Sequence, residues 1–374
     1  MSIRRFSILV LIIFVLSIIF SPFASMAEID EASYYPNDKS SPSKEFIYTI
    51  KDIKEVTFGD NKIKGVLYIP DKVPAPAIIF CNGKDTSIER YRYYDYDKWP
   101  ERRYINPETI CKEGYAVLMI EFRGYDATDG FFTFDTATED ISDAIDFLEE
   151  QDDVIKDKIG IVGFSLGGSI AIRASAEDDR IKTCIAICPI INIYDTPINW
   201  MNNQQNLPEN LNSVVNTGKE YLPLILSPNN PFLTCLKPFK FLRAPKACPA
   251  DLCLISFYLH DNQIVSCSTE GVAISKNPKV SPADLEYLFN DLEEYDVYSY
   301  IKEIYPRPVL IVSGTEDQIV SIDDVVMLQN KLLIELKDET DNKNIEFLYY
   351  DGDHCILDKE TADDIIKFLN ENLK

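Results

Sequence analysis

Short apolar runs alternate with amphipathic stretches along most of the chain. The runs predict buried strands at 77–81, 116–121, 159–162, 181–188, 308–313 and 344–350. Apolar residues recurring every three or four positions predict helices at 107–113, 136–150, 322–336 and 361–373, and a further helix that begins near Leu166. Val56–Phe58 and Ile63–Ile69, separated by Gly-Asp-Asn, predict a hairpin. Strands that alternate with helices indicate an α/β fold, with a mostly parallel, doubly wound sheet.

The alternation stops between residues 189 and 305. This segment is rich in Asn, Pro and aromatic residues, with cysteines interspersed, and contains helix-like pieces such as 282–292. We interpret this segment as a cap inserted between the sixth and seventh strands. The predicted organisation is therefore a polar leader at 28–52, the first part of the core at 53–188, the cap at 189–305 and the second part of the core at 306–374.

Residues 1–27 have the layout of an export signal. Arg4 and Arg5 precede an apolar run from Phe6 to Phe20, and small residues end the segment at Ala27, just before acidic Glu28. The run is shorter than the roughly 20 apolar residues that span a bilayer. We therefore expect cleavage after Ala27 and a secreted or cell-envelope protein. The alternative is a retained segment that associates the protein with a membrane.

Composition narrows the possible functions. A chain of 374 residues with 46% hydrophobic content can bury a large core, as one domain or as a domain with a cap. Its net charge of −24 argues against nucleic acid as a partner, because such a surface repels phosphate backbones. No organic cofactor or metal is indicated by any motif, so none is expected.

Nine cysteines are compatible with export. Those in apolar strand-like runs are expected to be buried thiols: Cys81, Cys184 and Cys188. Four others share one segment and could form two disulfides in three possible connectivities: Cys235, Cys248, Cys253 and Cys267. A zinc site there is less favoured, because the spacing contains no C-x-x-C pair and only His260 is nearby.

The segment from Gly163 to Gly167, Gly-Phe-Ser-Leu-Gly, lies between a predicted strand and a predicted helix. A serine on such a tight turn exposes its hydroxyl above the end of the sheet. The helix that follows directs its amino end, with its unpaired N–H groups, toward any oxyanion formed beside Ser165. Packing alone could also explain a glycine-rich turn, so Ser165 needs support from the rest of the chain.

A serine nucleophile needs a base, and the base needs an orienting carboxylate. The chain has two histidines, and only His354 directly follows a predicted strand. Asp317 follows the preceding strand in the same way, with Glu316 as the alternative if the loop is shifted by one residue. We expect His260, inside the predicted cap, to be structural or to face substrate.

The order Ser165, Asp317, His354, each after its own strand, resembles the α/β-hydrolase superfamily. Val117–Asp126 and Arg307–Asp317 are similar to the corresponding stretches of dienelactone-hydrolase-like and serine-aminopeptidase-like members. Many relatives carry His-Gly after the third strand, whereas this chain has Asn82 and Gly83. The resemblance implies an oxyanion hole formed by the backbone N–H groups of Leu166 and Lys84, or of Asp85 if the loop is shifted.

The resemblance implies a serine hydrolase that acts on a small-molecule ester or peptide through an acyl-enzyme. A carboxylic-ester hydrolase is the first interpretation. The alternative is a serine exopeptidase, which would need carboxylates such as those of Asp291–Asp296 to hold a free amino terminus. A catalytically inactive binding protein on the same fold is the third possibility, and the complete set of three residues argues against it.

Overall fold

The computed structural model describes residues 48–83, 88, 104–124, 128, 130, 132–192, 257–260, 263–268, 271–274, 295–336 and 344–374. The chain divides into two compact units. The smaller comprises residues 1–30 and 193–293, and its described part is an antiparallel sheet of β7 (Phe257–His260), β8 (Gln263–Ser268) and β9 (Gly271–Ile274). The larger comprises residues 31–192 and 294–374, and it holds every candidate catalytic residue.

An eight-stranded sheet organises the larger unit, in the order β1-β2-β4-β3-β5-β6-β10-β11. β2 runs antiparallel to both of its neighbours, and the other pairs are parallel. The strands are β1 (Ile50–Phe58), β2 (Ile63–Pro70), β3 (Ala75–Cys81), β4 (Ala116–Glu121), β5 (Val154–Phe164), β6 (Ile181–Ile187), β10 (Val309–Gly314) and β11 (Ile345–Tyr350). The predicted mostly parallel sheet and its leading hairpin are confirmed.

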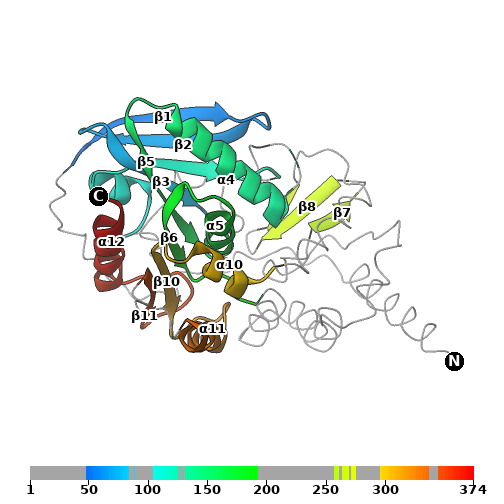
Figure 1. Cartoon of the computed structure of the whole chain (residues 1–374). Helices are drawn as coiled ribbons and strands as arrows, with labels where there is room; N and C mark the ends of the chain where they lie inside the picture. The colour runs from blue at the N-terminus through cyan, green and yellow to red at the C-terminus, as the bar shows by residue number, and fades with distance from the viewer. Residues whose placement is uncertain are drawn as a thin grey trace. The chain divides into compact units, whose positions relative to one another are not determined.

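Helices cover both faces of this sheet (Figure 1). They are α3 (Pro107–Lys112), α4 (Phe134–Glu149), α5 (Leu166–Glu177), α10 (Val297–Ile304), α11 (Ile322–Glu335) and α12 (Lys359–Leu373). α4 and α10 both pack on α5, and a Lys302–Glu335 ion pair joins α10 to α11. On the other face, Lys374 at the end of α12 donates a hydrogen bond to the Glu113 carbonyl at the end of α3. The sheet is therefore doubly covered, as expected.

Side-chain caps determine where several helices begin. Asn106 and Thr133 each form a capping box, with Thr109 and Thr136 as their respective partners, and Asp358 accepts a hydrogen bond from the Thr361 amide. These contacts satisfy N–H groups that have no acceptor within the helix. They also explain why α4 and α12 begin two residues before the positions that apolar periodicity predicts.

The larger unit extends beyond the predicted core at two points. β1 begins at Ile50, within the predicted leader, and α10 lies within the predicted cap yet packs on α5. The larger unit thus resumes at residue 294, where the prediction places it at 306. The predicted export signal and the predicted helix at 282–292 lie outside the described residues. Among the described residues, no helix combines the length and apolar character needed to cross a membrane.

The inserted unit leaves and re-enters the core at one place. The Tyr295 hydroxyl donates a 2.6 Å hydrogen bond to the Ile190 carbonyl, and the Ile190 amide donates to Ser169 Oγ at 2.8 Å. Ser169 is fully buried on α5. The chain before and after residues 193–293 is therefore joined within the larger unit, and both segments are fixed to the helix that follows Ser165.

Arg307, just before β10, fixes the carboxyl end of α5. Its guanidinium donates hydrogen bonds to the carbonyls of Ser175, Asp178 and Ile181 at 2.6, 3.0 and 2.8 Å. Carbonyls at the end of a helix lack intrahelical donors and carry partial negative charge, so a cation is favourable there. This side chain joins α5 and β6 to the chain as it returns from the insertion.

We predict that Arg307→Ala lowers the free energy of unfolding by about 2–4 kcal/mol, because three carbonyls lose a charged donor. Arg307→Lys should recover only part of the lost unfolding free energy, since one ammonium group cannot reproduce the hydrogen bonds of the planar guanidinium. Urea denaturation measures both. Lys302→Ala, which removes an exposed ion pair on α10, is the control and should change stability by under about 1 kcal/mol. Equal losses of unfolding free energy in Arg307→Ala and Lys302→Ala would contradict this role of Arg307.

Candidate active site

Ser165 occupies a strained turn between β5 and α5. Its φ is 51° and its ψ is −121°, a left-handed backbone conformation that non-glycine residues rarely adopt. The amide of Ser165 donates a 2.8 Å hydrogen bond to the Ile187 carbonyl, which ties the turn to the end of β6. The strand-to-helix turn expected around this serine is present, and its strain is consistent with a functional position.

Two glycines make this turn possible. A Cβ on Gly163 would lie 2.2 Å from the Gly167 carbonyl oxygen, and a Cβ on Gly167 would lie 2.3 Å from the Asn82 carbonyl oxygen. Both distances are far below van der Waals contact, so no other residue fits without moving backbone. The glycines therefore let α5 start directly above β5 and close to the end of β3, where Asn82 and Gly83 lie.

The amino end of α5 begins at Leu166, the residue after the serine. The first N–H groups of a helix have no intrahelical acceptor and carry partial positive charge, which suits them to bind an oxyanion. Leu166 is thus placed as the sequence predicts. The other expected donor, Lys84, lies outside the described residues, and so does its alternative Asp85.

His354 and Asp317 are in direct contact. His354 Nδ1 lies 2.7 Å from Asp317 Oδ2, and the Asp317 side chain is only 2% exposed. The other carboxylate oxygen, Asp317 Oδ1, accepts hydrogen bonds from the amides of Ile319 and Val320, both at 2.8 Å. Glu316, the alternative from the sequence, is exposed. The structure therefore pairs the imidazole with Asp317 through Nδ1.

Asp353 joins the two loops that carry this pair, and sequence reasoning did not single it out. Its Oδ1 accepts hydrogen bonds from the Gln318 amide at 2.9 Å and from the His354 amide at 2.7 Å. The Glu316 amide also donates to the Gly352 carbonyl at 3.0 Å. The loops after β10 and β11 are thus bonded to each other on both sides of the imidazole–carboxylate contact.

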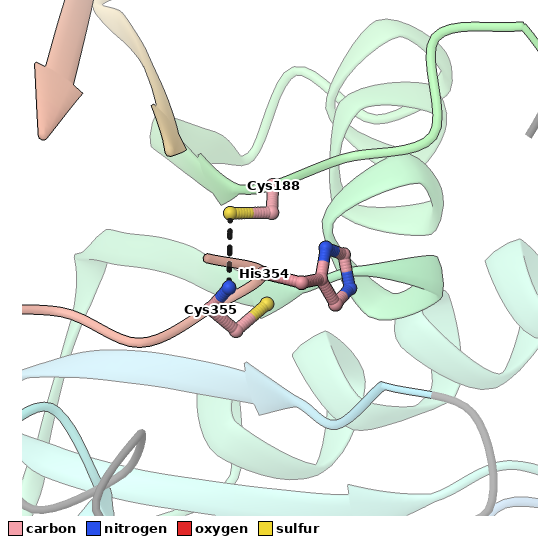
Figure 2. Close-up of side chains that lie close together, drawn as sticks. All are labelled: Cys188, His354 and Cys355. Atoms are coloured by element: carbon pink, nitrogen blue, oxygen red, sulfur yellow. Dashed lines mark hydrogen bonds between the residues drawn. The ribbon is translucent and has the colours of Figure 1, made fainter. Parts of the chain in front are cut away.

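Two buried thiols lie beside the imidazole (Figure 2). Cys188 Sγ accepts a 3.3 Å hydrogen bond from the Cys355 amide and lies 3.2 Å from the Tyr350 hydroxyl. Burial raises the pKa of Cys188, but the contacts with Cys355 and His354 outweigh it and lower the pKa to about 6. The sequence predicted Cys188 as a buried thiol, which is confirmed, as it is for Cys81 and Cys184.

The neighbours of His354 favour its protonated form. Burial lowers the pKa of the imidazole, but the charge and hydrogen bond of Asp317, together with the Cys188 sulfur, raise it well above the usual value. An opposite charge in direct contact favours the imidazolium, which is the form that a general base must reach during catalysis.

Ser165 and His354 are placed on the same edge of the sheet. The Ser165 amide bonds to Ile187, and the next residue, Cys188, lies against the imidazole. β5, β6, β10 and β11 are neighbours in that order, so Ser165, Cys188, Asp317 and His354 follow four adjacent strand ends. No hydrogen bond between the Ser165 hydroxyl and His354 is present in the described part of the chain.

Comparisons with known proteins identify the fold. The esterase Pf2001 of Pyrococcus furiosus superposes with a TM-score of 0.53, covering 86% of this chain and 91% of that chain, at 18% sequence identity. The model of the X-Pro dipeptidyl-peptidase (S15) family matches residues 59–222. The chain therefore has the α/β-hydrolase fold.

Curated relatives match part of the chain. The thiohydrolase aneE of Aspergillus aculeatus is 27% identical over 147 residues, which is 38% of this chain and 42% of that protein. The alpha/beta hydrolase ucsC of an Acremonium species is 35% identical over 135 residues, 34% of this chain and 25% of that protein. The chain thus spans less than half the length of either relative.

Some expectations from the sequence concern residues that the structure does not describe in full. The side chains of His260 in β7 and Cys267 in β8 lie outside the described part, as do Cys235, Cys248 and Cys253. The predicted disulfides therefore stay predictions. The five cysteines whose side chains are described are all buried: Cys81, Cys111, Cys184, Cys188 and Cys355.

We predict that the pKa of His354, measured by proton NMR titration, lies above the reference value of about 6.5 and falls toward it in Asp317→Asn. The chain has two histidines, so His260→Gln assigns the signals. Because the folded-state pKa is raised, the contact stabilises the protein fully below pH about 6.5 and loses this contribution as pH rises through the folded-state pKa. A His354 pKa at or below 6.5 in the unsubstituted protein would contradict this assignment.

Proposed function

We propose that the protein is an exported serine hydrolase that cleaves a carboxylic ester through Ser165, His354 and Asp317. The observation that carries this proposal is the 2.7 Å contact between His354 Nδ1 and Asp317 Oδ2, on the sheet edge that also holds the strained Ser165 turn. A carboxylate on Nδ1 sets the tautomer in which Nε2 has the free lone pair, and that lone pair accepts a serine proton.

In the proposed reaction, Ser165 Oγ attacks the acyl carbonyl while its proton passes to His354 Nε2. Asp317 stabilises the imidazolium that forms, and its own hydrogen bonds from Ile319 and Val320 hold the carboxylate in place. The imidazolium then protonates the leaving group. Water attacks the acyl-enzyme with His354 again as the base, which releases the acid and restores the serine.

Two backbone N–H groups would stabilise the tetrahedral oxyanion in this mechanism. Leu166 supplies the first at the amino end of α5, and we assign the second to Lys84 on sequence grounds. One such donor contributes about 10²–10³-fold to turnover. The close approach of Gly167 to the Asn82 carbonyl supports this assignment, because it brings the end of β3 next to the start of α5.

Export is the part of the proposal that rests on the sequence alone. The basic, apolar and small-residue order of residues 1–27 supports a secreted or cell-envelope location. Amino-terminal sequencing of the protein recovered from its native cells tests it. A mature chain that begins at Glu28 supports export, and an intact Met1 in the soluble cell fraction contradicts it.

A serine exopeptidase is the second candidate. The match of the X-Pro dipeptidyl-peptidase (S15) family model to residues 59–222 favours it, since that segment contains Ser165 and the strands around it. The same three catalytic residues serve both reactions. Ester cleavage remains the first choice, because its better leaving group demands less of the site than an amide does.

We predict that Ser165→Ala lowers kcat by at least about 10⁴-fold on any substrate that the protein cleaves, because the nucleophile is removed. The melting temperature should stay within a few degrees, since alanine is no larger than serine. Ser299→Ala, the same substitution at an exposed position on α10, is the matched control and should keep full turnover. Near-normal kcat in Ser165→Ala would exclude the proposed mechanism.

A substrate panel separates the two candidates. We expect p-nitrophenyl acyl esters to be cleaved with kcat/KM at least tenfold above that for aminoacyl, dipeptidyl and X-Pro anilides. Ser165→Ala gives the background for each compound. A preference for anilides, lost in this variant, would replace the esterase assignment with the exopeptidase.

A further inference from the structure

Two thiols that the proposed hydrolysis does not use converge on its base. Cys188 follows β6 and Cys355 follows β11, and one ligand atom from each of Cys188, His354 and Cys355 lies within 4.8 Å of the other two. Figure 2 shows the three side chains gathered at the ends of these strands. Both thiols are buried, whereas the imidazole is 14% exposed, so the cluster meets solvent through the histidine.

The donor set suits a thiophilic cation. Two thiolates and one imidazole are ligands that Zn²⁺ and similar ions prefer over hard cations. Tetrahedral zinc, with bonds of about 2.0–2.3 Å, holds its ligand atoms roughly 3.4–3.8 Å apart. The three atoms therefore need to draw together by roughly 1 Å, which side-chain rotation can supply, and a fourth position is left for water.

The backbone at both thiols is strained. Cys188 has a φ of 48° and Cys355 a φ of 58°, and neither is glycine. Such conformations each cost of order 1 kcal/mol or more and persist where the surroundings hold them. Here the Cys188 amide donates a 2.7 Å hydrogen bond to the Val312 carbonyl, which holds its left-handed turn at the end of β6. With these backbone conformations, both sulfur atoms lie within 4.8 Å of a ring nitrogen of His354.

Neighbouring groups orient the three donors, as outer contacts do around metal ligands. The Cys355 amide donates to Cys188 Sγ at 3.3 Å, and Tyr350 Oη lies 3.2 Å from the same sulfur. Asp317 Oδ2 holds His354 Nδ1 at 2.7 Å. A carboxylate bonded to a histidine that ligates zinc is a frequent arrangement.

We propose that Cys188, His354 and Cys355 bind a divalent cation of the zinc class and that its binding inhibits hydrolysis. Binding forms two metal–sulfur bonds and one metal–nitrogen bond, and it releases to solvent the protons that the thiols still carry and the one proton that the imidazolium must lose to ligate the metal. No oxidant or reductant is needed. A neutral imidazole has one nitrogen lone pair, so a bound cation removes the lone pair that would accept the serine proton. The inhibition rests on the proposed function, whereas the site does not.

Cadmium titration tests the site directly. The full chain is treated with EDTA, desalted with a phosphine reductant and titrated with CdCl₂, and ultraviolet thiolate-to-cadmium charge transfer is followed. We expect the unsubstituted protein to bind one more Cd²⁺ per chain than Cys188→Ala or Cys355→Ala does. Four cysteines at 235–267 could add to the total signal, so this difference is the readout. Cys111→Ala, which removes a buried thiol on α3, is the matched control and should keep the full signal.

Zinc inhibition tests the consequence. ZnCl₂ should reduce p-nitrophenyl ester hydrolysis at least tenfold in the unsubstituted protein and in Cys111→Ala, and EDTA should restore it. In Cys188→Ala and Cys355→Ala, half-inhibition should require at least tenfold more Zn²⁺. Each variant is compared with its own metal-free rate, and its melting curve is recorded. Cys188→Ala and Cys355→Ala test the site independently. If one of them does not fold, the other still decides the test.

The outcomes separate the two proposals. Equal cadmium binding in the unsubstituted protein and both variants overturns the site. The cadmium difference without zinc inhibition overturns the inhibition and keeps the site. The cadmium difference in a protein that cleaves no ester or anilide keeps the site and overturns the proposed function.

Discussion

The contact between Asp317 and His354 exists because two parallel strands end in register. Gly314 at the end of β10 pairs with Tyr350 at the end of β11, so the loops that follow start from the same level of the sheet. Asp353 then bonds to the amides of both loops. A carboxylate buried to this degree would be costly if it were alone, and it is stabilised by two amides and an imidazole. Every functional argument for this protein depends on that satisfied pair.

The same edge shows how a parallel sheet concentrates chemistry. Four neighbouring strands deliver a serine, a thiol, a carboxylate and an imidazole to adjacent positions, although these residues are spread over nearly 200 positions of sequence. These side chains can be short and still reach their neighbours, because adjacent strands in a sheet lie about 5 Å apart. Strain is concentrated there too, at Ser165, Cys188 and Cys355. The regular core behind this edge supplies the stability that holds these conformations.

Most of the sheet could be predicted from the sequence, because its strands are apolar runs bounded by polar loops. β5 is longer than predicted because its first half carries the exposed Lys156 and Asp157 and the half-buried Lys158, which break the apolar pattern. α10 was assigned to the cap because its neighbours in sequence are irregular, and only its packing on α5 reveals its place. Local patterns carry no information about such contacts.

The candidate site, too, could be predicted from the sequence only in part. Ser165, Asp317 and His354 could be found because each follows a strand in a pattern that chemistry restricts. The role of Cys355 could not be found, since its partner Cys188 is 167 residues away and nothing near either residue indicates the other. Asp353 was not predicted for a different reason. An aspartate in a loop is common, and its role is visible only from the backbone amides that donate hydrogen bonds to it.

The hydrogen bond from Tyr295 to Ile190 has a consequence for how this protein can diversify. This bond joins the chain on either side of residues 193–293. The segment between can therefore lengthen, shorten or be exchanged while the strand ends of the large sheet keep their positions. Sequence changes can therefore accumulate between residues 193 and 293 while the groups at this edge of the sheet stay in place.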